Sequence, residues 1–146
     1  MNTEDIQCTC LAVRQAARQI TQLYDTELGP TGLRVTQYSV LSMLDRAGSS
    51  SLQDLAAAMV MDRSTLGHNL RPLERDGLIK LAVDKSDKRA RRLELTARGK
   101  AKLDEARPLW RSAQERFDAS FGAASAKELR AVLRRVVDST QHLQEA

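Results

Sequence analysis

Polar side chains between residues 62 and 71 have the types and the spacing that recognise base pairs in DNA. They lie on the side of a predicted helix opposite Leu66, Leu70 and Leu73, whose steps of four and three mark one helical face. Arginine pairs bidentately with guanine and asparagine with adenine, whereas serine and threonine hydroxyls more often contact phosphate. The candidate contacts are Arg63, Ser64, Thr65, His68, Asn69 and Arg71. For an isolated helix, a face turned to solvent would explain the same pattern.

A basic segment follows this helix and holds the largest share of the positive charge. The chain of 146 residues has a net charge of +4, and residues 62–98 carry ten Lys and Arg against six Asp and Glu, whereas residues 1–61 are net acidic. Such a segment is either a solvated loop or an electrostatic contact for phosphate, and its position directly after the polar helix favours phosphate. Its candidate contacts are Lys85, Lys88, Arg89 and Arg91.

No arrangement of residues predicts catalysis, so we expect neither a catalytic residue nor a cofactor. The sequence has no nucleophile elbow and no glycine-rich phosphate loop, and its two histidines, His68 and His142, are isolated. Cys8 and Cys10 supply only two of the four ligands of a structural zinc site, so no metal is expected. They also lie too close together to staple a core.

Composition predicts a mainly helical, single-domain protein. With 29% charged and 42% apolar side chains, the chain is not disordered, and its length suits one domain. Only 3% of the residues are aromatic, which disfavours a β-sandwich or barrel. No apolar run reaches the ~18 residues of a membrane span, and the acidic N-terminus is unlike a signal or transit peptide. We therefore expect a cytoplasmic protein without membrane association.

The elements that must position these side chains follow from apolar spacing and capping residues. A first amphipathic helix is predicted over residues 4–28, where apolar side chains recur at steps of three and four. These positions are Ile6, Cys10, Val13, Ala17, Ile20, Leu23 and Tyr24. Five more helices are predicted from residues that cap a helix N-terminus, namely Thr36, Ser51, Asp62, Thr96 and Ser125. We expect them to end near residues 47, 57, 76, 120 and 142, and the runs 78–83 and 90–95 predict a β-hairpin.

Two short helices, a tight turn at residues 58–61 and a hairpin form a winged helix-turn-helix pattern. The predicted fold class is therefore mainly α with a small β-hairpin. Residues 62–79, DRSTLGHNLRPLERDGLI, resemble the recognition helix of the MarR family of bacterial transcription regulators. Residues 84–99, DKSDKRARRLELTARG, resemble its wing, including the D-x-R core and the L-T-x-x-G that opens the next helix. Gly67-His68 departs from the bulkier residue and arginine common in the family, which leaves the operator sequence open.

The resemblance implies that residues 1–146 are a single MarR-like domain that forms a homodimer. A winged helix-turn-helix lobe would occupy residues 33–96, and helices within 4–28 and 97–143 would join the two subunits. The dimer would bind a pseudo-palindromic operator in double-stranded DNA as a repressor. Arg89 would enter the minor groove, with Asp87 and Asp62 orienting its guanidinium.

The resemblance also implies a signal that releases DNA, and one form of it is a small aromatic acid or phenol. Arg14 and Arg18 lie about one turn apart on the first predicted helix, and a guanidinium can fork to a carboxylate. Neighbours of this effector site would be Tyr38, Met43 and Met61. The two arginines could equally form a surface pair or a salt bridge between subunits.

An oxidant is the alternative signal. Cys10 lies early in the first predicted helix, as does the reactive cysteine of the organic-hydroperoxide sensors in the family, and Tyr38 matches one of their tyrosines. A free cysteine is otherwise a small buried hydrophobe. Outside the class of DNA-binding regulators, a helical interaction module without specific DNA binding would explain the basic hairpin as a solubility feature.

Overall fold

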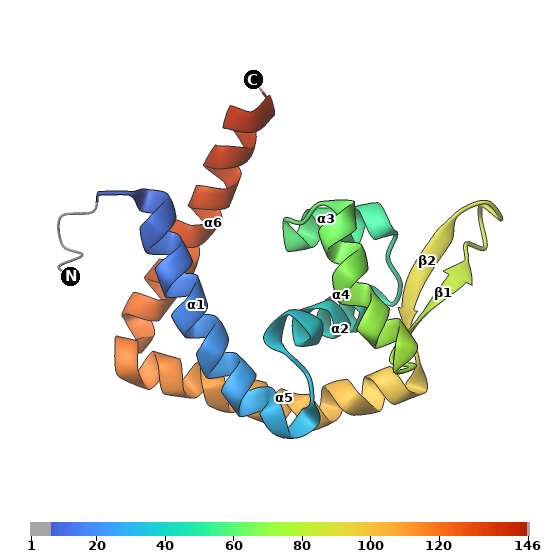
Figure 1. Ribbon diagram of the computed structural model, residues 1–146, viewed down its shortest axis with the longest axis horizontal. Helices are drawn as coiled ribbons and strands as arrows, with labels where there is room; N and C mark the ends of the chain where they lie inside the picture. Colours follow the sequence, from blue (N-terminus) through green and yellow to red (C-terminus); the bar gives the residue numbers. More distant parts are fainter. Residues whose placement is uncertain (1–6, 146) are drawn as a thin grey trace. The chain divides into compact units, whose positions relative to one another are not determined.

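The computed structural model of the chain describes residues 7–145 and is mostly helical (Figure 1). Its helices are α1 (Thr9–Leu28), α2 (Val35–Ala47), α3 (Leu52–Met59), α4 (Arg63–Arg75), α5 (Ala97–Phe121) and α6 (Ala123–Glu145), with a short 3-10 helix η1 (Gly29–Thr31) after α1. The chain divides after Trp110 into two compact units, which we call the first and the second unit. None of the helices within residues 7–145 is long and apolar enough to cross a lipid bilayer.

Leucines from three helices build the core of the first unit. Leu41 and Leu44 of α2, Leu55 of α3, and Leu66 and Leu73 of α4 are each at most 2% exposed. Burying one such side chain contributes about 1.5–3 kcal/mol. The apolar stripe of each helix therefore holds α2, α3 and α4 together as the predicted helix-turn-helix lobe (Figure 1).

A two-stranded antiparallel hairpin follows α4, as the sequence predicts. Strand β1 (Ile79–Val83) pairs with β2 (Arg91–Leu95), and Leu81 lies opposite Leu93. Ser50, in the connection between α2 and α3, adds an isolated bridge, because its N–H and C=O both bond to the backbone of Leu93. The middle of β2 is thus attached to the segment that leads into α3.

The junction between the hairpin and α5 explains the L-T-x-x-G sequence. The hydroxyl of Thr96 caps α5 by accepting the N–H of Gly99 at 3.0 Å, and it donates to the carbonyl of Gly77. The N–H of Thr96 bonds to the carbonyl oxygen of Leu78 at 3.1 Å. A β-carbon built on Gly99 would lie only 1.9 Å from that same oxygen. Glycine is required because the backbone of α5 passes directly against the backbone that enters β1.

Three of the predicted helix caps are confirmed. Ser51 accepts the N–H of Asp54 at the start of α3, and Asp62 accepts the N–H of Thr65 at the start of α4. Thr96 is the third. Each of these bonds spans three residues, which is why local sequence predicts them.

The starts of the other three helices differ from the prediction. The first helix begins at Thr9, not at residue 4, because the backbone of Cys8 is extended; residues 4–6, with Ile6, lie outside the described residues. Helix α2 begins after Arg34, not at Thr36, because the side chains of Asp25 and Gln37 accept the N–H groups there.

Helix α6 begins at Ala123, so the predicted cap Ser125 lies inside it. The reason is Gly122, whose φ of 96° ends α5 and whose carbonyl already accepts the N–H of Ala126. Helix α6 also continues past His142 to Glu145.

The predicted apolar face of the first helix is buried only near its C-terminal end. Tyr24 and Leu28 are buried, whereas Cys10, Val13 and Ala17 are exposed. The interpretation of Cys10 as a buried hydrophobe is therefore wrong.

The second unit contains the end of α5 and all of α6. The rings of Phe117 and Phe121 stack with their centroids 5.3 Å apart, and Arg130 pairs with Asp118 at 3.5 Å. Large apolar side chains of this unit remain exposed, namely Phe121, Val132, Leu133 and Leu143.

Candidate DNA-binding interface

The first turn of α4 is held rigidly by Asp62. Its carboxylate accepts the backbone N–H of Thr65 at 2.7 Å and the hydroxyl of the same residue at 2.8 Å. The bond from the Thr65 backbone is the main reason that the pKa of Asp62 lies below its usual value. The cap therefore fixes the backbone of the first turn, from which the polar side chains of α4 extend.

Polar side chains of α4 face solvent on the side opposite its buried leucines. Ser64, His68 and Arg71 are exposed and lie at steps of four and three along the helix. Arg63 and Thr65 are also exposed at its N-terminal end. These residues present hydrogen-bond donors that can pair with acceptors on base edges in the major groove.

Asn69 differs from the other predicted contacts on α4. It is half-buried, and its amide nitrogen donates to the backbone carbonyl of Thr65 at 2.9 Å. Arg75, which is not among the predicted contacts, is exposed on the same side as His68 and pairs with the neighbouring Asp76 at 3.2 Å. Its position seven residues after His68 was the signal that could have identified it.

Acidic side chains shape the turn of the hairpin. Asp84 accepts the N–H and the hydroxyl of Ser86, and the hydroxyl bond is the main cause that lowers the pKa of Asp84. Asp87 accepts the N–H of Arg89 at 3.0 Å. These carboxylates form hydrogen bonds within the turn, and the Lys and Arg side chains around them are exposed.

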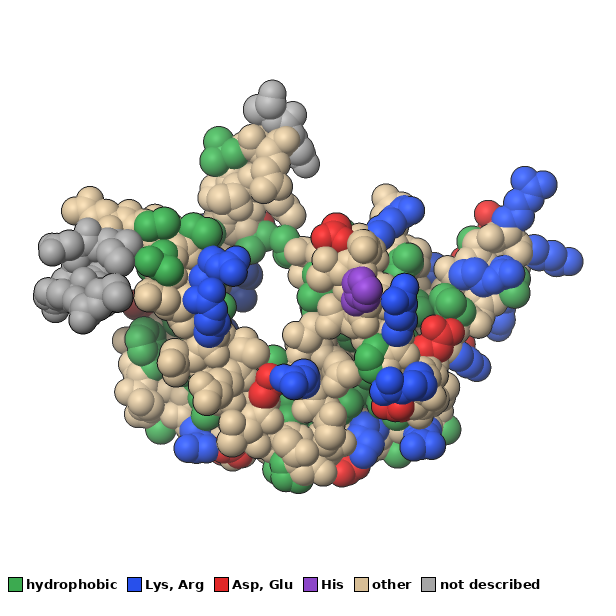
Figure 2. Space-filling model, viewed as in Figure 1, with side chains coloured by type: hydrophobic (Ala, Val, Ile, Leu, Met, Phe, Trp, Pro, Cys, Tyr) green, Lys and Arg blue, Asp and Glu red, His purple; other side chains and the backbone are tan. Residues whose placement is uncertain are grey.

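The predicted hairpin contacts Lys85, Lys88, Arg89 and Arg91 are all exposed. Figure 2 shows Lys and Arg side chains gathered on the hairpin and beside α4. Asp87 and Asp62, predicted to orient the guanidinium of Arg89, are bonded instead to backbone and to Thr65; among residues 7–145 no ion pair joins them to that guanidinium.

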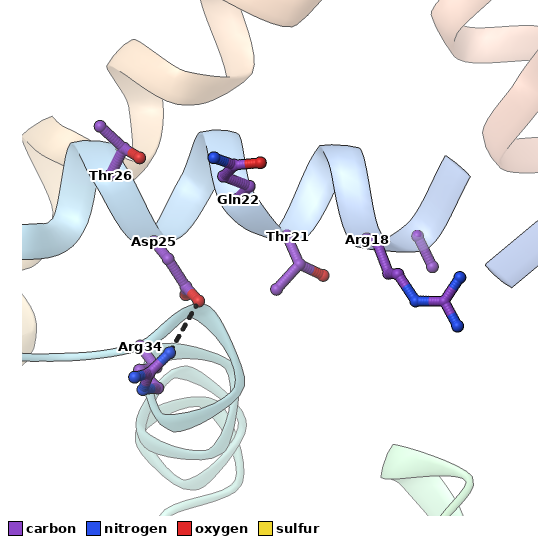
Figure 3. A pocket seen from close by; sticks show the side chains of 7 residues that line it. Arg18, Thr21, Gln22, Asp25, Thr26 and Arg34 are labelled. Carbon is purple, nitrogen blue, oxygen red and sulfur yellow. Dashed lines mark hydrogen bonds and ion pairs between the residues drawn. The ribbon is translucent and has the colours of Figure 1, made fainter. Parts of the chain in front are cut away.

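The predicted effector residues do not meet in one cavity. Arg18 lines a groove of about 540 Å³ along α1, together with Thr21, Gln22 and Arg34 (Figure 3). In this groove the guanidinium of Arg34 pairs with Asp25 at 3.4 Å.

The other four predicted effector residues lie elsewhere. Arg14 is exposed on α1, and Met43 lines a second cavity of about 420 Å³ between α2 and α3. Tyr38 is buried and stacks on Trp110 with ring centroids 5.6 Å apart, and Met61 packs against the core.

The two cysteines flank the start of α1. The Sγ atom of Cys8 accepts the backbone N–H of Leu11 at 3.5 Å, which makes Cys8 the N-cap of the helix. Cys8 and Cys10 are both free and exposed.

Comparison with known proteins identifies the family. Residues 33–90, which contain α2 to the hairpin turn, match the MarR family. The transcriptional regulator HosA of Escherichia coli is 34% identical over 117 residues, which cover 80% of this chain and 82% of HosA. The chain belongs to the MarR family. It is therefore a DNA-binding transcriptional regulator with a winged helix-turn-helix fold, as the sequence predicts.

Two further relatives of this MarR-family regulator cover nearly all of it. The transcriptional repressor NicR of Pseudomonas putida is 28% identical over 130 residues, which cover 89% of this chain and 82% of NicR. The crystal structure of the regulator MosR of M. tuberculosis in complex with DNA has a TM-score of 0.83 and 38% identity, covering 93% of this chain and 98% of MosR.

Proposed function

We propose that this MarR-family regulator is a homodimeric repressor that places α4 in the major groove and the hairpin in the minor groove of a pseudo-palindromic operator. The observation that carries the proposal lies in the first unit. There, the polar face of α4 and the four exposed cations of the hairpin follow each other directly in the chain. Ser64, His68 and Arg71 reach base edges or phosphates, and Arg89 enters the minor groove.

Replacement of Arg89 tests this arrangement. A narrow minor groove concentrates negative potential, so we expect Arg89→Ala to weaken operator binding at least tenfold without unfolding the protein. Fluorescence anisotropy with a labelled operator measures the affinity, and circular dichroism measures the fold. The matched control is Lys127→Ala, which removes an exposed cation of α6 outside both DNA-binding elements. Unchanged affinity in Arg89→Ala would contradict the proposed role of the hairpin.

Exposed apolar side chains support the homodimer. Val132 and Leu143, which are eleven residues apart, lie on the same face of α6, Leu133 is adjacent to Val132, and each of the three is more than a third exposed in the single chain. A second copy of the chain would remove them from water. We expect Leu133→Asp to shift the protein from dimer to monomer in sedimentation velocity and to weaken operator binding. A wild-type protein that sediments as a monomer at micromolar concentration would refute the dimer.

An aromatic carboxylate is the proposed effector, and the groove of Figure 3 is its proposed site. No ion pair engages the guanidinium of Arg18 among residues 7–145, so it can fork to a carboxylate. The hydroxyl of Thr21 and the amide of Gln22 line the same groove.

Calorimetry with benzoates and hydroxycinnamates tests this site. We expect Arg18→Gln to abolish the heat of binding, whereas Arg14→Gln, which alters an exposed arginine of α1 outside the groove, should leave it. Absence of heat with the wild type, or equal binding by Arg18→Gln, would refute it.

The exposure of both cysteines supports a hydroperoxide as a second signal that releases DNA. A hydroperoxide would oxidise the thiolate of Cys10 to a sulfenic acid and leave as the alcohol, and Cys8 would then condense with the sulfenic acid to a disulfide and release water. Cys8 would have to leave the N-cap, which removes the bond from Leu11. We expect peroxide to release operator DNA from the wild type but not from Cys10→Ser; release from both would contradict this role.

A further inference from the structure

Arg92 belongs to the basic run of the hairpin, yet its side chain turns toward the protein. Its Nε donates to the hydroxyl of Ser49 at 2.8 Å, and its Nη2 donates to the carbonyl oxygen of Ser49 at 3.1 Å. Its Nη1 lies 3.6 Å from the carboxylate of Asp84. The side chain of Arg92 is 34% exposed and that of Asp84 only 17%. One guanidinium thus joins β2, the start of the hairpin turn and the connection between α2 and α3.

The neighbouring Arg91 shows what a freely exposed cation on the same strand looks like. It is exposed, and its guanidinium makes one long bond, 3.4 Å, to the carbonyl of Lys88 inside the turn. Successive side chains of a strand point to opposite faces, so Arg91 and Arg92 have the same chemistry and different surroundings.

The segment that Arg92 contacts leads directly into the helix-turn-helix. Ser49 binds the guanidinium, Ser50 bridges to the backbone of Leu93, and Ser51 caps α3. A two-stranded hairpin is marginally stable by itself, so these contacts along β2 contribute to the direction in which it extends. The backbone bridge of Ser50 fixes β2, and the side chain of Arg92 extends that attachment to Asp84, which directly follows β1.

We propose that Arg92 is a positioning residue that holds the hairpin at the angle at which Arg89 reaches the minor groove while α4 occupies the major groove. The role rests on the proposed function, because it acts through the DNA contact of Arg89. The two bonds to Ser49 need two N–H donors held in one plane, as in the guanidinium group of arginine. Lysine carries a single ammonium group on a flexible side chain and cannot provide them.

Charge-preserving variants separate positioning from phosphate contact. We expect Arg92→Lys to weaken operator binding about tenfold, because the fork to Ser49 is lost. Arg98→Lys, which changes an exposed arginine of α5 outside both DNA-binding elements, should stay within about twofold of the wild type. A phosphate contact tolerates lysine, so near-wild-type affinity of Arg92→Lys would overturn the proposal.

Combined variants exclude a general loss of structure. In the background of Arg89→Ala, Arg92→Lys should weaken operator binding by less than about twofold. The orientation of the hairpin no longer affects affinity once its minor-groove contact is absent. Ser49→Ala, which changes no charge, should weaken binding about threefold alone and should add nothing to Arg92→Lys. A tenfold loss that persists in the Arg89→Ala background would assign Arg92 a merely structural role. A wild-type protein without salt-dependent DNA binding would refute the proposed function itself.

Discussion

The contact between Gly99 and the backbone of Leu78 predicts opposite effects for two glycine-to-alanine substitutions in helices. A methyl group at Gly99 would lie 1.9 Å from the carbonyl oxygen of Leu78, where ordinary van der Waals contact begins at 3.4 Å. The two segments would have to separate by about 1.5 Å, in a protein interior that is already close-packed. The carbonyl cannot retreat freely, because it accepts the N–H of Thr96 at 3.1 Å.

The magnitude follows from three contributions to the free energy of unfolding. Overpacking costs about 1–3 kcal/mol. Weakening the bond from Thr96 to Leu78 costs about 1 kcal/mol more. Alanine is favoured over glycine in a helix by about 1 kcal/mol, which offsets part of the loss. We expect Gly99→Ala to lower the free energy of unfolding by about 2 kcal/mol.

Gly67 in α4 is the matched control. A β-carbon there would have no atom within 4 Å, so Gly67→Ala should gain about 0.5–1 kcal/mol from helix preference alone. Urea unfolding followed by far-ultraviolet circular dichroism measures both variants, at one protein concentration because association changes apparent stability. A Gly99→Ala protein as stable as the wild type would refute the close-approach argument. Equal losses in both variants would refute it as well.

Three other sites in the first unit should give separable effects. The hydrogen bond from Lys100 lowers the pKa of Asp45 in the folded protein. Asp45→Asn should therefore lower the free energy of unfolding by about 0.5–1 kcal/mol at pH 7, measured by urea titration. The variant and the wild type should become equally stable as the pH falls below about 4, because the carboxylate of Asp45 is then protonated in the wild type as well. Ser51→Ala removes the cap of α3 and should cost about 1 kcal/mol in the same assay, so wild-type stability would contradict the cap. His68→Ala should weaken operator binding at least fivefold in anisotropy titrations, whereas Asn69→Ala, whose amide is bonded within α4, should stay within about twofold; the reverse order would contradict this assignment.

Features that depend on neighbouring residues could be predicted from the sequence, and features that depend on distant contacts could not. The caps Ser51 and Asp62 bind an N–H three residues later, so their local pattern is sufficient. The start of α2 was missed because its cap includes Asp25, which α1 contributes from ten residues earlier. A start at Thr36 satisfied the local pattern equally well.

The candidate site shows the same division. The exposed cations of the hairpin follow from composition, and the alternation of a strand already separates Arg91 from Arg92. The partner of Arg92 could not be predicted, because Ser49 lies 43 residues earlier in the chain. The predicted effector residues do not share one cavity, and this too depends on distant contacts. Tyr38 is buried against Trp110 because α2 packs on α5.

The stacking of Tyr38 on Trp110 gives this regulator a built-in optical signal. Trp110 is the only tryptophan in the sequence, so each chain emits from a single indole. That indole lies on α5 at the last position of the first unit, with its plane tilted by 13° from the Tyr38 ring of α2. Any event that separates α2 from α5 changes the contact and hence the emission. Unlabelled protein can therefore report whether DNA, a small acid or a peroxide alters this packing, in real time and at one known position.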